Sequence, residues 1–454
     1  MAEPPWILKH GLAVIGAMGL GLPRATVEQL VADVGQFHRD SALAVLLRLN
    51  LALTHHTPLS QEEILRNWLP DVANRFLAVM REQKVEVVFY EAQVLNLIRL
   101  VILHAPADGG RRCDQKGDIT LLARILLQIT DMLVERDAKA EPDRRAWVFG
   151  NFTRTELFTH DEPRVPDAMA RNYDLFVLVP RLLNRRGHTY DLPGTFAKIT
   201  GLAIEDYIGL GFGLLSQYDT IDAGLIGHAD IGIDRSTYLA NVRLAAEVRD
   251  RLWPLVSKPL DEYQAALRRE WERTSGAARW SAMTTFSQFP MIELLNGPVV
   301  AVSRRLLRDR VTHGIYWILA NNLPGRERDD FTNFFGHVFE AYYEEIIHKG
   351  GRLKGRMIKP VTLLTTRDVD SIEGIIWDGD AWPDLLTRKH TERHVDDSFH
   401  NYVYRVFNGE IPRNEYLRVR WHRIGDMIGT RLFGETLDHS ADAGPKRRFR
   451  RRRR

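Results

Sequence analysis

Two carboxylates in the last third of the chain have the chemistry and setting needed to share a divalent cation. Glu340 lies at the edge of an apolar stripe, and Asp370 opens the second of two apolar runs that follow the stripe. Hard cations such as magnesium prefer carboxylate oxygens as ligands. A helix carboxylate and a strand carboxylate that converge would therefore form a metal site, and we expect Glu340 and Asp370 to do so.

The elements that must position these carboxylates are a helix and a β-hairpin. Apolar residues recur at i, i+3, i+4 and i+7 through residues 331–347, which predicts a helix, and Gly350-Gly351 is typical of a helix end. Met357–Leu364 and Ser371–Trp377 have strand character, and Asp378-Gly379 is a hairpin signal. The predicted order is α-β-β.

The sequence FFGHVFEAYYEEII, followed by DVDSIEGIIWDGD, resembles the start of the PD-(D/E)XK, or restriction-endonuclease-like, nuclease superfamily. It is most similar to bacterial members with a long helical N-terminal region. The resemblance covers Phe331–Asp380 and implies that Glu340 and Asp370 are catalytic residues that bind magnesium or manganese and act on DNA. Asp368 is the alternative to Asp370. Such a cation neutralises charge on the phosphate and activates water.

The third strand of that superfamily carries an acidic-x-Lys triplet, and here the chain departs from the pattern. After Asp380 it reads AWPDLLTRKH, so Asp384 is the nearest further metal ligand and Lys389 the nearest catalytic lysine, five residues apart. Pro383 also disfavours a central strand. Three explanations stay open: a shifted motif, a degenerate member without catalysis, or a changed reading frame after Asp380. The coding DNA tests the last explanation.

The basic character of the chain is concentrated at its end. The last nine residues carry eight positive charges, so removing them from the total of +3 leaves −5 for residues 1–445. This tail predicts electrostatic contact with nucleic acid through Lys446, Arg447, Arg448 and Arg450. The alternative is a solvated, disordered end without a binding role.

Upstream of residue 326 the pattern is helical, apart from a small hairpin predicted at the turn Asn296-Gly297-Pro298. Ser60 with Glu63 is a capping-box pattern, Asp118 is the expected N-cap of Ile119–Leu133, and Gly201 is expected to join two helices. The sequence thus predicts a mainly α protein whose helical N-terminal and middle regions precede a small α/β restriction-endonuclease-like domain. The predicted boundaries are 1–145, 146–325, 326–437 and 438–454.

Composition and smaller motifs limit the classes of protein to which this chain can belong. One cysteine, Cys113, excludes an internal disulfide and favours a reducing, cytoplasmic setting, where we expect it exposed in a polar loop. No run reaches the length of a membrane span. GLGFG at 209–213 is interpreted as small residues for helix packing. The leading hypothesis is a metal-dependent nuclease or a degenerate relative. The alternative is a non-catalytic helical scaffold with protein partners, or a nucleic-acid-binding protein.

Overall fold

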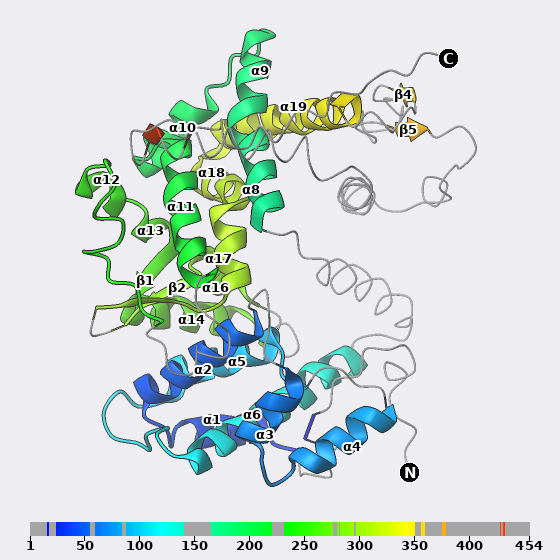
Figure 1. Ribbon diagram of the computed structural model, residues 1–454, viewed down its shortest axis with the longest axis vertical. Helices are drawn as coiled ribbons and strands as arrows, with labels where there is room; N and C mark the ends of the chain where they lie inside the picture. Colours follow the sequence, from blue (N-terminus) through cyan, green and yellow to red (C-terminus); the bar gives the residue numbers. More distant parts are fainter. Residues whose placement is uncertain are drawn as a thin grey trace, which may run out of the picture. The chain divides into compact units, whose positions relative to one another are not determined.

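The chain is mainly helical, as predicted, with a small mixed sheet (Figure 1). The computed structural model describes residues 16–17, 24–54, 60–83, 88–139, 165–219, 231–275, 279–280, 282–294, 297–349, 356–358, 375–377, 427 and 430–431, and 70% of the interpretable residues are helical. The restriction-endonuclease-like domain itself stays a prediction.

Two compact units alternate along the chain. The first unit comprises Met1–Phe152, Gly211–Ala240 and Arg249–Gly314, and the second comprises Thr153–Leu210, Asn241–Val248 and Ile315–Arg454. The units are built from segments distant in sequence, whereas the predicted domains are consecutive. The predicted boundaries stay predictions.

The first unit is a set of packed helices whose central member is α5 (Glu91–His104), which contacts α1, α2, α6 and α14. Eleven consecutive residues of α5, from Gln93 to Leu103, are buried, so this helix is covered on all sides. The unit also contains α1 (Val27–Val34), α2 (Arg39–Leu53), α3 (Gln61–Trp68), α4 (Ala73–Gln83), α6 (Lys116–Lys139), α13 (Trp253–Val256), α14 (Leu260–Arg273), α16 (Thr284–Gln288) and α17 (Arg304–Val311).

Local capping signals explain where several helices begin. Ser60 is the N-cap of α3, and its hydroxyl accepts a hydrogen bond from the Glu63 amide at 3.1 Å, as the sequence predicts. The prediction for Asp118 is wrong, because α6 begins two residues earlier. Asp118 is a buried residue of the first turn and forms an ion pair with Arg111. Its negative charge is stabilised there by the positive end of the helix dipole.

The first unit also holds a three-stranded sheet in the order β1 (Ser257–Pro259), β2 (Met291–Glu293) and β3 (Val299–Ala301). The antiparallel β2–β3 pair confirms the predicted hairpin, and Gly297 supplies the positive φ of +100° that its turn requires. The parallel partner β1 was not predicted. The sequence of Ser236–Val256 also predicts a helix, but this prediction is wrong, since only the short helices α12 (Ala246–Asp250) and α13 form there.

The second unit is built from α8 (Val165–Tyr173), the π-helical turn η3 (Asp174–Leu178), α9 (Val179–Arg185), α10 (Leu192–Thr200), most of α18 (Gly314–Asn322) and α19 (Gly325–Lys349). The helix α11 (Ile204–Asp219) begins in this unit and ends in the first. Gly201 ends α10 in the left-handed conformation, with φ of 72°, and so confirms the predicted junction between two helices.

The interpretation of GLGFG as a helix-packing segment is confirmed. Gly211 lies inside α11, and a Cβ atom there would lie 2.7 Å from Val311 Cβ of α17. No side chain larger than hydrogen fits at this contact without movement.

The long helix α19 begins earlier than the apolar stripe indicates. The charged residues of Asn321–Asp330 predict a polar linker, but this prediction is wrong, because α18 continues to Asn322 and α19 starts at Gly325. Strands β4 (Arg356–Ile358) and β5 (Ile375–Trp377) follow and pair antiparallel, with Met357 opposite Ile376. The predicted α-β-β order is confirmed in this part of the chain.

Among the described residues, no single helix is long and apolar enough to cross a membrane. The bent pair α10 and α11 meets those criteria only when the two are counted together, with a 63° bend between them.

Candidate functional site on helix α19

Glu340 is the one predicted metal ligand that lies in the described part of the chain. Its side chain is 41% exposed on α19, and Oε2 lies 3.5 Å from Nδ1 of His337, one helical turn earlier. That separation is at the outer limit of a hydrogen bond. Glu340 is therefore placed beside a basic nitrogen and still open to a ligand from solvent.

A second histidine reaches the same place from another element. His188 follows α9, and its ring centroid lies 4.9 Å from that of His337 and 6.2 Å from that of Phe334. The amide of His188 donates to Leu183 O at 3.1 Å, which ties this residue to the end of α9. Neither histidine was predicted as a site residue. The spacing of His337 and Glu340 was a visible signal, whereas nothing local connects His188 to them.

An aromatic cluster holds the helix that carries Glu340. Phe335 of α19 stacks on Phe176 of η3 at 5.2 Å between ring centroids and contacts Tyr316 of α18 at 4.9 Å. Phe331 and Phe335 are buried, and α19 packs against α9 and η3. The apolar stripe of α19 therefore packs against aromatic side chains of η3 and α18, while the Glu340 side chain on the same helix is exposed.

The remaining predicted site residues lie outside the described residues. They are Asp368, Asp370, Asp384, Lys389, Lys446, Arg447, Arg448 and Arg450. Within the described ranges, no group of three or more His, Cys, Asp or Glu side chains is arranged to hold a metal ion. The convergence of Glu340 and Asp370 thus stays a prediction. The exposed carboxylate of Glu340 offers the oxygen ligands that magnesium and manganese prefer.

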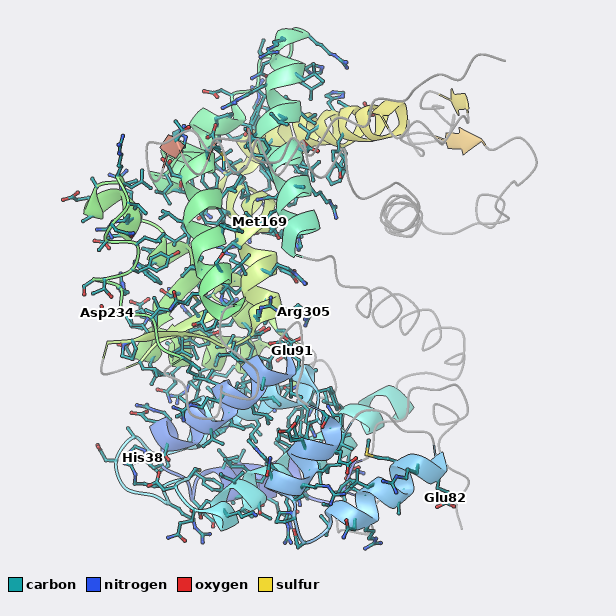
Figure 2. The ribbon with its side chains drawn as sticks, viewed as in Figure 1. His38, Glu82, Glu91, Met169, Asp234 and Arg305 are labelled. Carbon is teal, nitrogen blue, oxygen red and sulfur yellow. The ribbon has the colours of Figure 1, made fainter. Side chains whose placement is uncertain are left out.

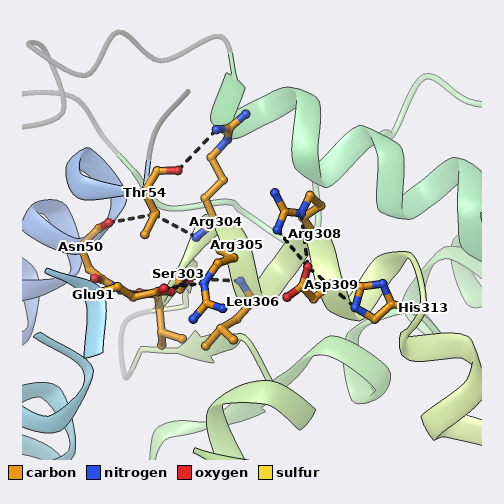
Figure 3. A network of polar contacts seen from close by, with 11 residues as sticks. Asn50, Thr54, Glu91, Ser303, Arg304, Arg305, Leu306, Arg308, Asp309 and His313 are labelled. Atoms are coloured by element: carbon orange, nitrogen blue, oxygen red, sulfur yellow. Dashed lines mark hydrogen bonds and ion pairs between the residues drawn. The ribbon is translucent and has the colours of Figure 1, made fainter. Parts of the chain in front are cut away.

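The first unit contains a separate polar cluster whose residues were not predicted to form a site (Figures 2 and 3). Glu91, at the start of α5, accepts hydrogen bonds from the Ser303 hydroxyl and from Arg305 Nε, the latter at 2.5 Å. Ser303 also caps α17 by accepting from the Leu306 amide at 3.1 Å. One carboxylate thus joins the beginnings of two helices.

The cluster continues along α17, which carries four arginines in its eight residues (Figure 3). Arg304 donates to Thr54 O at 3.4 Å, and Arg308 forms an ion pair with Asp309 at 3.1 Å. His313 Nε2 lies 3.9 Å from the same Asp309 oxygen. Arg304 and Arg308 are buried. These arginines therefore contribute to internal contacts and do not form a solvent-facing basic stripe.

Cys113 differs from its predicted environment, because it is buried instead of exposed. Its amide donates to the Ser41 hydroxyl at 2.8 Å. Burial raises the pKa of the Cys113 thiol to about 12, and the charge of Asp118 acts in the same direction, outweighing Arg111. The thiol is protonated at neutral pH and is not an activated nucleophile.

No family model matches this chain, and comparisons with curated proteins and with solved structures gave no significant match either.

Proposed function

We propose that this chain is a divalent-metal-dependent nuclease that acts on DNA, with Glu340 as a metal ligand. The observation that supports this proposal most directly is the solvent-facing carboxylate on a helix anchored by buried aromatic residues and followed by the antiparallel pair β4–β5. This α-β-β order is the one that the resemblance to the PD-(D/E)XK superfamily implies.

The proposed ligand set combines Glu340 with Asp370, and with Asp384 as a further candidate. Magnesium or manganese bound there would neutralise phosphate charge and lower the pKa of a bound water. Within the chain, His337 lies close enough to restrict the orientation of the Glu340 carboxylate. Lys389 is the residue proposed to position or deprotonate the water.

The test is a nicking assay on plasmid and single-stranded DNA with magnesium or manganese, using the full chain, Glu340→Ala and Asp370→Ala. Loss of a metal ligand should reduce nicking at least about 100-fold, since even residues that only orient ligands are worth 10- to 100-fold. Glu327→Ala is a matched control, because Glu327 is exposed on the same helix and pairs with Lys198. Unchanged nicking by Glu340→Ala would refute the assignment of Glu340.

A non-catalytic scaffold or nucleic-acid-binding protein is the second candidate, and one observation favours it. Residues 1–445 carry a summed charge of −5, whereas a nuclease needs a basic surface to hold its phosphate backbone. This candidate predicts DNA binding that depends on the tail, with no nicking at any magnesium or manganese concentration. The same assay therefore separates the two functions.

A further inference from the structure

Two adjacent carboxylates in the second unit are buried at the start of α11. Glu205 and Asp206 lie in the first turn of this helix, and their side chains are only 9% and 11% exposed. The positive end of the helix dipole favours the two carboxylates there, but only weakly. Removing two like charges from water is much more costly unless cations pair with them.

Two arginines supply those cations from opposite directions in the sequence. Arg181 of the neighbouring helix α9 forms an ion pair with Glu205 Oε1 and so neutralises one of the two carboxylates. Arg431 comes from the C-terminal part of the chain, with Nη1 2.9 Å from Asp206 Oδ1 and Nη2 3.8 Å from Glu205 Oε2. The guanidinium of Arg431 thus spans both carboxylates.

The geometry matches the recognition of a guanidinium by carboxylates. A planar guanidinium presents a fork of N–H donors, and here two of its nitrogens face two different carboxylates. Arg431 is 40% exposed while the carboxylates are buried. The two carboxylates therefore belong to the fixed first turn of α11, whereas the partly exposed Arg431 side chain is the partner that can move into solvent.

We propose that Glu205 and Asp206 form a docking site for an arginine side chain, and that its occupant is Arg431. Docking holds Arg431 against α11 and neutralises the carboxylates at the start of this helix. Release of Arg431 into solvent removes this cation and loosens the first turn of α11 in the same step. The proposal does not depend on nuclease activity.

Hydrogen exchange measured by mass spectrometry on the full chain tests this docking. Arg431→Ala should speed amide exchange roughly tenfold both in peptides covering 204–208 and in peptides covering 427–431, because a buried carboxylate loses its cation. Arg431→Lys should restore part of the protection, since it keeps the charge but loses the fork. Lys198→Ala is the control: its amine lies 3.9 Å from Glu327 in an exposed pair of the same unit, and less than about a twofold change is expected.

A double-mutant cycle separates docking from unrelated destabilisation. Asp206→Asn and Arg431→Ala combined should speed exchange little more than either change alone. Additive effects, or unchanged exchange over 204–208 in Arg431→Ala, would overturn the proposal. If Asp206→Asn does not fold, raising the salt from about 0.05 to 1 M replaces it. Salt should then speed exchange at 204–208 in the starting protein and not in Arg431→Ala, and equal salt effects in both would overturn the proposal.

Discussion

Arg305 Nε lies 2.5 Å from Glu91 Oε2, so an ion pair links the first residue of α5 to the first turn of α17. The side chains are 31% and 14% exposed, and Ser303 shares the carboxylate. Ion pairs of this burial are costly to break on one side only, because the remaining charge stays partly desolvated.

Glu91→Ala should therefore lower the free energy of unfolding by about 2–3 kcal/mol, because it removes the acceptor of both Ser303 and Arg305. Glu91→Gln keeps one acceptor oxygen and should cost about half as much. Urea unfolding followed by tryptophan fluorescence measures both. Glu62→Ala is the control, since Glu62 forms an exposed i,i+4 pair with Arg66. Equal effects of the Glu91 and Glu62 changes would contradict the structural role of Glu91.

Phe335→Ala should destabilise the second unit by about 3–5 kcal/mol, because it leaves a cavity where its ring contacts Phe176, Tyr316 and Phe331. Thermal unfolding measures the loss. Phe339→Ala, one turn later on a less buried side chain, should cost clearly less. A smaller effect at Phe335 than at Phe339 would show that the aromatic cluster does not anchor α19.

The stability of the first unit should depend on pH through Cys113. Its pKa is raised to about 12 in the folded chain, against about 8.5 unfolded. The folded thiol keeps its proton above pH 8.5 while the unfolded thiol releases it. The free energy of unfolding therefore falls as pH rises, by up to about 1.4 kcal/mol per pH unit from this group.

Cys113→Ala removes that contribution. Between pH 8 and pH 10 the variant should lose about 1–2 kcal/mol less stability than the starting protein. Urea midpoints measured at pH 8, 9 and 10 give the two slopes. Burial also raises the pKa of Tyr263, with the same sign above pH 10, but this residue is common to both proteins. Parallel slopes would mean that the thiol titrates alike in both states.

Replacing the eight basic residues of 446–454 by serine should weaken DNA binding and flatten its dependence on salt. Each phosphate contact that is lost removes about 0.9 from the slope of log affinity against log salt for duplex DNA. Fluorescence anisotropy at two or more salt concentrations gives both quantities. An unchanged slope would show that residues 446–454 have no role in binding nucleic acid, which is the alternative interpretation of the tail.

Several elements follow from local sequence because their causes lie within a few residues. The Ser60 cap, the junction at Gly201, the hairpin turn at Gly297 and the helix α14 each depend on neighbours along the chain. Predictions failed where tertiary packing competes with a local signal. Asp118 looks like an N-cap, yet it lies within the first turn of a helix that begins at Lys116, where it forms an ion pair with Arg111.

The helical class, the aromatic stripe of α19 and Glu340 as a candidate ligand could all be predicted from the amino-acid sequence. Three pairings could not: His188 beside His337, Arg305 with Glu91, and Arg431 with Asp206 became visible in the folded chain. Helical periodicity repeats every few residues and can be read from one segment. Pairs brought together across a fold carry no such signal, because their partners are selected by the packing of whole helices.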